Sequence, residues 1–240
     1  WLHRQGARLS VADTRETPPG VATLQAELPS VKLHTGAFTQ VVFNDAEIIV
    51  ISPGVPMAEP MVQAAVERCV PVVGDVELFA QYKPAGAKVI AITGANGKST
   101  VTTLVGEMCK VAGLKTVVAG NIGLPVLDTL NGDLTDVYVL ELSSFQLETT
   151  SSLNAEVATV LNISEDHMDR YDGLDDYAQA KARVFFGKGV QVLNRQDDWS
   201  MSMALQGRAV VTFGLDEAAN DSDFGLVTQA EDSQLMRGQK

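Results

Sequence analysis

The sequence predicts an α/β protein with two domains, each a doubly wound, mostly parallel β-sheet. Short apolar segments rich in Val and Ile alternate with segments of helical length and periodicity, the pattern of parallel strands joined by helices. Several apolar segments also end in polar or glycine-containing turns, where open α/β sheets bind ligands. The stretch Lys83-Pro84-Ala85-Gly86-Ala87 breaks this pattern. We therefore expect one domain over residues 1–84 and a second over residues 85–240.

The first domain is predicted from a few short segments. They are a helix end over Trp1–Gly6, strands over Ala7–Ala12, Ala46–Ile51 and Val70–Val73, and helices over Met61–Arg68 and Asp75–Tyr82. The first strand runs into Asp13-Thr14-Arg15, and the second into Ser52-Pro53-Gly54. An acid at a strand's carboxyl end can bind the polar edge of a nucleotide or cap a turn, and spacing alone does not separate the two. Because residue 1 is Trp rather than Met, we expect an excised piece.

The second domain is predicted from a regular alternation of strands and helices. Its segments are Lys88–Thr93, Lys98–Ala112, Lys115–Ala119, Pro125–Leu130, Val137–Leu142, Val157–Ile163, Tyr177–Phe186 and Val190–Leu193. Beyond residues 210–214 the pattern weakens, with a strand over Phe224–Thr228 and another near Leu235. These two are expected to form part of a hairpin.

The segment Gly94-Ala95-Asn96-Gly97-Lys98-Ser99-Thr100 predicts a phosphate-binding loop between a strand and a helix. Glycine lets the backbone approach a phosphate closely, and the N–H groups of the first helical turn point at the anion. Lys98 adds a positive charge, and the Ser99 hydroxyl is placed to bind Mg²⁺. The loop is two residues shorter than the usual pattern. An ordinary strand-turn-helix connection is the alternative.

Three further residues are candidates for the same edge of the sheet. Glu141 ends an apolar strand, where a phosphate loop usually has its metal-binding acid, although a surface glutamate would fit the same pattern. His167 lies between acids after the strand over residues 157–163, and could bind Mg²⁺ or phosphate or sit in a solvated acidic turn. Lys181, taken from sequence alone, is interpreted as a surface lysine on a helix.

Composition excludes several classes of protein. The net charge of −12 argues against nonspecific binding to nucleic acid or to an anionic membrane. The longest apolar runs are far shorter than the roughly 20 residues that span a bilayer. Cys69 and Cys109 are too few for a disulfide framework, so we expect buried free thiols in helices and a cytoplasmic location.

Four separated motifs together resemble the Mur ligase family of peptidoglycan synthesis. They are Thr93–Thr100, Gly120-Asn121-Ile122-Gly123, Glu141-Leu142-Ser143-Ser144-Phe145-Gln146 and Asn162-Ile163-Ser164-Glu165-Asp166-His167-Met168-Asp169. The turns Asp13-Thr14-Arg15 and Ser52-Pro53-Gly54 resemble the family member that adds D-glutamate. The resemblance implies a Rossmann-like UDP-binding N-terminal domain and a central P-loop ATPase domain. It also implies that the first strand and a C-terminal domain lie outside these 240 residues, which alone would be inactive.

The resemblance further implies an activity and its site. The activity is ATP-dependent ligation of D-glutamate to UDP-N-acetylmuramoyl-L-alanine through an acyl phosphate, carried out by a monomer that binds neither nucleic acid nor membrane. Residues 94–100 would bind ATP. Two Mg²⁺ ions would be held by Ser99, Glu141, His167 and a carbamylated Lys181, with Lys98, His167 and Lys181 catalytic. The substrate contacts would be Asp13, Thr14, Arg15, Gly54, Asn121, Ser143 and Gln146.

Two alternatives remain open. The first is another ligase of this kind, either a different Mur ligase or a folylpolyglutamate synthetase. A folate enzyme would have no UDP-binding half, whereas this sequence has about 80 residues of α/β pattern before the loop. The second is a P-loop kinase or nucleotide switch outside the ligases, which would use a full-length loop and a strand-end Asp.

Overall fold

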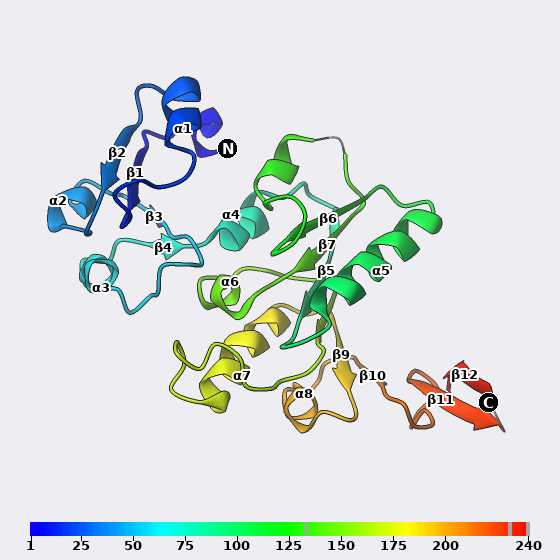
Figure 1. Cartoon of the computed structure of the whole chain (residues 1–240). Helices are drawn as coiled ribbons and strands as arrows, with labels where there is room; N and C mark the ends of the chain where they lie inside the picture. The colour runs from blue at the N-terminus through cyan, green and yellow to red at the C-terminus, as the bar shows by residue number, and fades with distance from the viewer. Residues whose placement is uncertain (133, 230–231, 239–240) are drawn as a thin grey trace. The chain divides into compact units, whose positions relative to one another are not determined.

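The computed structural model describes residues 1–132, 134–229 and 232–238, shown in Figure 1. The chain forms two compact units, Trp1–Val73 and Gly74–Lys240. The division falls before helix α4 (Asp75–Tyr82), which packs within the second unit, whereas the sequence-based boundary falls after it. The domain limits 1–84 and 85–240 remain a prediction.

The first unit contains two separate pairs of parallel strands. Strand β1 (Ser10–Asp13) pairs with β2 (Lys32–Thr35), and β3 (Ile49–Val50) with β4 (Val72–Val73). The helical segments are η1 (Leu2–Gln5), α1 (Val21–Glu27), α2 (Gln40–Phe43) and α3 (Pro60–Glu67). A small core forms around Phe43, Ile51 and Val62. The parallel pairing is as predicted, whereas α1, β2 and α2 were not predicted.

The second unit is built on a sheet of eight strands among the described residues, in the order β12-β11-β10-β9-β8-β5-β7-β6. The pairings from β10 to β6 are parallel, and β11 pairs antiparallel with β12. The strands are β5 (Lys88–Thr93), β6 (Thr116–Gly120), β7 (Val137–Glu141), β8 (Val157–Val160), β9 (Val190–Asn194), β10 (Val210–Phe213), β11 (Phe224–Gln229) and β12 (Asp232–Arg237). The predicted α/β fold and the terminal hairpin are confirmed.

Helices cover both faces of this sheet. Because successive side chains of a strand point to opposite faces, β5 contributes to the core on each side. Ile90 and Ile92 pack with helix α5 (Lys98–Val111) on one face. Val89 and Ala91 belong to the larger core on the other face. Figure 1 shows α5 on one side of the sheet and α4, α6 and α7 on the other. The remaining helical segments are η2 (Asp128–Asn131), α6 (Ser144–Glu148), α7 (Leu174–Ala182), η3 (Arg183–Phe185) and α8 (Asp198–Ser202).

Several local predictions need correction. The helix expected over 125–130 is only the short 3-10 segment η2, and the helix expected over 177–186 divides into α7 and η3. Helices α6 and α8 were not predicted, because each has five residues and shows little periodicity. The expectation of two buried thiols in helices is wrong for Cys69, which is exposed and follows α3 with a positive φ of 62°. Both cysteines are free, and Cys109 is half-buried.

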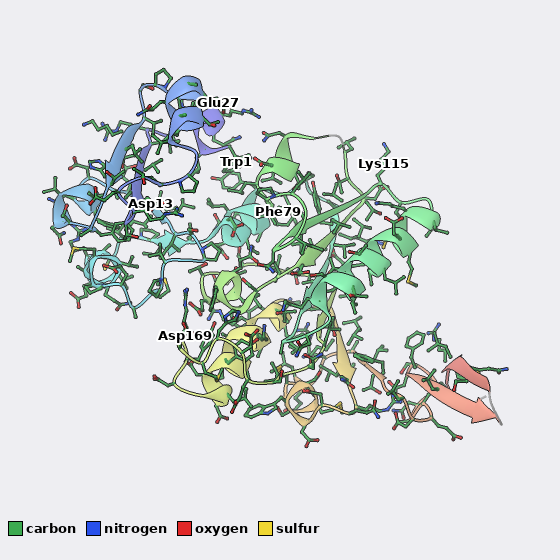
Figure 2. The ribbon with its side chains drawn as sticks, viewed as in Figure 1. Trp1, Asp13, Glu27, Phe79, Lys115 and Asp169 are labelled. Carbon is green, nitrogen blue, oxygen red and sulfur yellow. The ribbon has the colours of Figure 1, made fainter. Side chains whose placement is uncertain are left out.

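Helix α4 is fixed to the second unit by the buried carboxylate of Glu77. Its Oε2 atom accepts hydrogen bonds from the backbone N–H groups of Ser151 (2.7 Å) and Ser152 (2.9 Å). Its Oε1 atom accepts one from Gln81 Nε2 at 2.8 Å. Burial alone would raise the pKa of Glu77, but the hydrogen bonds from Ser151 and Ser152 outweigh it and leave the pKa below its usual value. Nearby, Phe79, labelled in Figure 2, packs edge-on against Tyr138 at 5.0 Å.

We predict that Glu77→Gln lowers the free energy of unfolding at pH 7 by about 1–3 kcal/mol, because an amide group cannot accept at both positions. Since the folded-state pKa is depressed, the wild-type advantage is present above the ordinary glutamate pKa of about 4.3 and is lost as the pH falls through the folded value. Urea unfolding at pH 7 and below pH 4 measures both effects. Glu107→Gln, at an exposed ion pair with Lys110, is the control. Equal effects of the two variants would contradict the prediction.

Candidate active site

The predicted phosphate-binding loop lies at the point where the chain changes direction across the sheet. From β5 the chain continues to β6 and β7 on one side, and then to β8 on the other side of β5. Open α/β sheets bind ligands at the carboxyl ends of strands at such a switch point. The loop requires glycine here, because Gly94 has a φ of 154° and a Cβ atom would approach Leu161 Cβ to 3.0 Å. Gly97 has a φ of 81° and caps α5.

The side chain of Asn162, two residues after β8, holds the loop in place. Its Oδ1 atom accepts from the Asn96 backbone N–H at 2.8 Å, and its Nδ2 atom donates to the Asn96 carbonyl at 3.0 Å. The Asn162 carbonyl accepts from the Ala95 N–H at 2.9 Å. Two of the loop's amides are thus engaged by Asn162. The amides left facing an anion are those of the first turn of α5, at Lys98, Ser99 and Thr100, which have no partner within the helix.

The ammonium group of Lys98 lies over the same loop. It donates to the carbonyl oxygens of Gly94 and Ala95, both at 3.0 Å. Ser99 and Thr100 are exposed at the start of the helix. The loop therefore presents a lysine charge, two hydroxyl groups and the first-turn amides at one edge of the sheet, the arrangement that binds a phosphate group.

Glu141 lies at the carboxyl end of β7 and is 1% exposed. Its Oε1 atom accepts from Asn121 Nδ2 at 2.7 Å, and its backbone carbonyl accepts from the Asn121 N–H at 2.8 Å. Its Oε2 atom is buried and has no hydrogen-bond partner in the described part of the chain. A buried carboxylate oxygen with an open coordination position suits a hard cation such as Mg²⁺. The interpretation of Glu141 as a surface residue is wrong.

Lys181 is 1% exposed, so its sequence-based interpretation as a surface lysine is also wrong. Its Nζ atom lies 3.4 Å from Thr93 Oγ1 and 4.5 Å from the centre of the Tyr177 ring. Burial, and after it the charge of Lys98, lowers the pKa of Lys181 to about 7, although the charges of Asp166 and Glu141 oppose the shift. Lys98, Glu141 and Lys181 are therefore close enough to interact electrostatically.

His167 occupies the loop that follows β8. It has a positive φ of 56° and an exposed side chain, and its Nε2 atom lies 3.5 Å from Asp166 Oδ2. Its ring centre lies 4.8 Å from that of Phe145. Figure 2 labels Asp169 on the same loop. The described residues include no group of three or more His, Cys, Asp or Glu side chains that could hold a metal ion. The set Ser99, Glu141, His167 and Lys181 remains a prediction.

The residues expected to contact the substrate lie at strand ends in each unit. Ser143 and Gln146 form a reciprocal capping box at the start of α6: Ser143 Oγ accepts from the Gln146 N–H, and Gln146 Oε1 accepts from the Ser143 N–H, both at 3.2 Å. In the first unit, Asp13 ends β1, and Thr14 and Gly54 are exposed. Two hydrogen bonds from the Arg15 guanidinium, at 2.8 and 2.6 Å, lower the pKa of Asp13 to about 2.

Three residues to which the sequence analysis gave no role belong to this region. Asn162 positions the phosphate-binding loop, and the charge of Asp166 acts on Lys181. Tyr177 faces the Lys181 ammonium. The Tyr177–Lys181 contact could have been predicted from the sequence, because residues four apart on a helix lie on the same face. The contact of Asn162 with the loop spans 66 residues and had no local signal.

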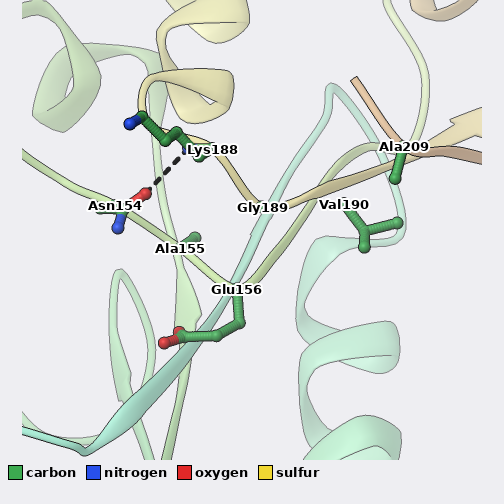
Figure 3. Close-up of a pocket in the computed structure, with 7 residues that line it drawn as sticks. All are labelled: Asn154, Ala155, Glu156, Lys188, Gly189, Val190 and Ala209. Atoms are coloured by element: carbon green, nitrogen blue, oxygen red, sulfur yellow. Dashed lines mark hydrogen bonds between the residues drawn. The ribbon is translucent and has the colours of Figure 1, made fainter. Parts of the chain in front are cut away.

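A pocket lies at the opposite, amino-terminal end of the strands. Figure 3 shows this pocket of about 250 Å³, lined by Asn154, Ala155, Glu156, Lys188, Gly189, Val190 and Ala209. Its polar groups serve the fold: Asn154 Oδ1 accepts from the Lys188 N–H at 2.9 Å, and the Glu156 carboxylate accepts from the Val89 N–H at 2.5 Å. The candidate active site is therefore the edge that carries the phosphate-binding loop.

The sheet topology and the loop define an α/β protein of the P-loop class. Comparison with known proteins makes this more specific. Residues 92–238 match the Mur ligase middle domain, and residues 1–74 match the Mur ligase MurD-like N-terminal domain. The chain belongs to the Mur ligase family. This rules out the alternative of a P-loop kinase or switch outside the ligases.

Curated relatives agree with this assignment, and a solved structure shares the fold. A UDP-N-acetylmuramoylalanine–D-glutamate ligase of Methylobacillus flagellatus is 66% identical over all of this chain and 53% of its own length. One of Thiobacillus denitrificans is 55% identical over 94% of this chain and 52% of its own. The chain thus spans about half the length of these relatives. The fold resembles that of the UDP-N-acetylmuramate:L-alanyl-gamma-D-glutamyl-meso-diaminopimelate ligase from Neisseria meningitides, with a TM-score of 0.60, 15% identity, and coverage of 98% of this chain and 78% of that one.

No helix within residues 1–132, 134–229 and 232–238 combines the length and apolar character needed to cross a bilayer.

We predict that Asn162→Ala increases the hydrogen-exchange rate of the Asn96 amide about tenfold, because the amide loses its side-chain acceptor. Asn154→Ala is a matched control, since it removes a similar amide acceptor at the other end of the sheet. Exchange is followed by NMR in folded protein. Unchanged exchange of Asn96 in Asn162→Ala would show that the loop holds its shape without this contact.

Proposed function

We propose that the whole protein is an ATP-dependent ligase that joins D-glutamate to UDP-N-acetylmuramoyl-L-alanine in peptidoglycan precursor synthesis. The observation that carries this proposal is the 66% identity with a D-glutamate ligase across the entire chain, including both units. The convergence of Lys98, Glu141 and Lys181 at one sheet edge supports it. Because the N-terminal unit matches a MurD-like domain, the proposal is favoured over a folylpolyglutamate synthetase.

The reaction has two steps with balanced bonds. A carboxylate oxygen of UDP-N-acetylmuramoyl-L-alanine attacks the γ-phosphorus of ATP, the bond to the bridging oxygen breaks, and ADP leaves. The amine of D-glutamate then attacks the acyl carbon, inorganic phosphate leaves with the carbon–oxygen bond pair, and the amine loses a proton. The first step brings an anion to a polyanion, so cationic groups at the site lower its barrier.

In this proposal residues 94–100 bind the phosphates of ATP. The Lys98 ammonium moves from the carbonyl oxygens of Gly94 and Ala95 to the phosphoryl group that is transferred. The backbone N–H groups of Lys98, Ser99 and Thr100 donate hydrogen bonds to the oxygens of that phosphoryl group. Gly94, Ala95, Asn96 and Gly97 shape the loop around them. Asn162 keeps the loop in the conformation that presents these donors.

We propose that two Mg²⁺ ions bind at this edge of the sheet. The partnerless oxygen of Glu141 is the observation that supports a cation, and Ser99 would be its companion ligand. His167 and a carbamylated Lys181 would hold the second ion. When bound, the ions would neutralise charge on the phosphates and so reduce repulsion of the incoming carboxylate.

Lys181 is suited to carbamylation because its amine is neutral in much of the population near pH 7. Its pKa of about 7 results first from burial, and only a neutral amine attacks carbon dioxide. Attack by the neutral amine forms a nitrogen–carbon bond and releases one proton, which leaves a carbamate anion; starting from the ammonium form, two protons are released in all. An anion in place of the ammonium would relieve its repulsion with Lys98 and would orient the γ-phosphate.

We propose for the UDP-sugar substrate the contacts that the family resemblance implies. Asp13, Thr14 and Arg15 would bind the uracil end, with the Arg15 guanidinium held in place by Asp13. The remaining contacts along the substrate's path would be Gly54, Asn121, Ser143 and Gln146. We further propose a cytoplasmic monomer that binds neither nucleic acid nor membrane, in keeping with the net charge of −12.

The function is tested by measuring phosphate release from ATP by the full-length protein with UDP-N-acetylmuramoyl-L-alanine and a panel of amino acids. We expect release with D-glutamate and little with L-glutamate or L-lysine. In Lys98→Ala, activity should fall at least a hundredfold, because the transferring phosphoryl group loses its cation. Lys110→Ala, at an exposed lysine on the same helix, is the control. Preference for another amino acid would refute the proposed specificity.

For Lys181 we expect that Lys181→Ala abolishes activity and that added acetate or formate restores part of it, because a small carboxylate can replace the carbamate. Lys181→Arg has a permanent charge and should not be restored. Activity is measured with increasing carboxylate concentration. Full activity of Lys181→Ala without any carboxylate would exclude a role for the carbamate.

A further inference from the structure

The loop that carries His167 is anchored to helix α6 by a compact polar cluster. Glu148, the last residue of α6, accepts one hydrogen bond at each carboxylate oxygen. Arg170 Nη2 donates to Oε2 at 3.2 Å, and the Tyr171 hydroxyl donates to Oε1 at 2.5 Å. Burial and the Glu148 contact both raise the pKa of Tyr171, so the phenol keeps the proton that it donates. The cluster therefore joins α6 to the residues just after His167.

Aromatic contacts extend this anchor to His167 itself. The Arg170 guanidinium carbon lies 4.0 Å from the centre of the Phe145 ring, and the His167 ring lies 4.8 Å from the same centre. Phe145 also stacks on Tyr171 at 6.1 Å with an interplanar angle of 20°. The ring of Phe145 thus contacts both the imidazole of His167 and the two anchored residues, Arg170 and Tyr171.

The backbone at His167 needs such support. A φ of 56° is uncommon for a residue with a side chain and persists only where the surroundings fix it. The Arg170 N–H donates to the His167 carbonyl at 2.9 Å, closing a turn whose far end is the anchored Arg170. Glu148 therefore stabilises the turn that directs the imidazole.

We propose that Glu148 is a positioning residue, which, through Arg170, Tyr171 and Phe145, holds His167 in the conformation in which it serves the phosphate-binding edge. This rests on the role proposed above for His167. Glu148 lies in the segment between the Ser143–Gln146 capping box and Thr149, so one short helix supports both substrate contacts and the His167 loop. Loss of Glu148 should release His167 without unfolding the unit.

The anchor is tested by NMR on the 240-residue chain, in which the signal of His167 is identified among three histidines by its loss in His167→Gln. Glu148→Gln should accelerate exchange of the Arg170 amide about tenfold and move the His167 ring signals away from the position set by Phe145. Tyr171→Phe, which removes one donor only, should shift both readouts in the same direction by less. Glu107→Gln should change neither.

Wild-type values of both readouts in folded Glu148→Gln would overturn the proposal. If Glu148→Gln does not fold, Tyr171→Phe decides it by the same two readouts. A separate measurement adds Mn²⁺ and ADP and follows the broadening of the His167 signal. Broadening in the wild type that weakens severalfold in Glu148→Gln supports positioning, whereas equal broadening in both contradicts it. If no broadening occurs in the wild type while the first two readouts respond, the metal role of His167 fails and the anchor remains.

Discussion

The parallel pairing of β5 with β8 is the constraint on which the site depends. It brings two segments more than 60 residues apart to the same edge, so the turn after β5 meets the residues after β8. Asn162 then engages both the N–H and the carbonyl of Asn96, much as a neighbouring strand would. The short loop is therefore shaped by a tertiary contact as well as by its own glycines. Without this pairing, Lys98 and Glu141 would have no fixed relation to Lys181.

Burial then gives these residues their chemical character. A lysine with 1% exposure, close to the charge of another lysine, is partly neutral near pH 7, whereas an exposed one would not be. A glutamate whose second oxygen has no partner in the described chain is ready to accept a cation, whereas a solvated one is not. Burial therefore changes the chemical character of these two side chains beyond what the motif alone specifies.

The sequence predicted the main features of the fold and of the loop, because both have local signals. Val- and Ile-rich segments before polar turns indicate parallel strands, and glycines next to a Lys-Ser-Thr helix start indicate a phosphate loop. Lys181 could not be predicted to be buried. It lies on a helix with weak apolar periodicity, and the residues next to it in the sequence do not indicate its contact with Thr93 at the end of β5. Asn162 and Glu148 act through partners far away in the chain, so no spacing rule could assign them. Short elements such as α6 were missed because five residues show too few turns to display a period.

Gly120 shows how the architecture limits the paths open to mutation. It has a φ of 109°, and any Cβ atom there would lie 2.2 Å from the carbonyl oxygen of Glu141. The obstacle is the main chain at the carboxyl end of the neighbouring strand β7, so no compensating change of a side chain can make room. Substitution of Gly120 by any other residue is therefore expected to be selected against. Tolerated variation around the carboxyl ends of β6 and β7 would therefore have to arise at other positions.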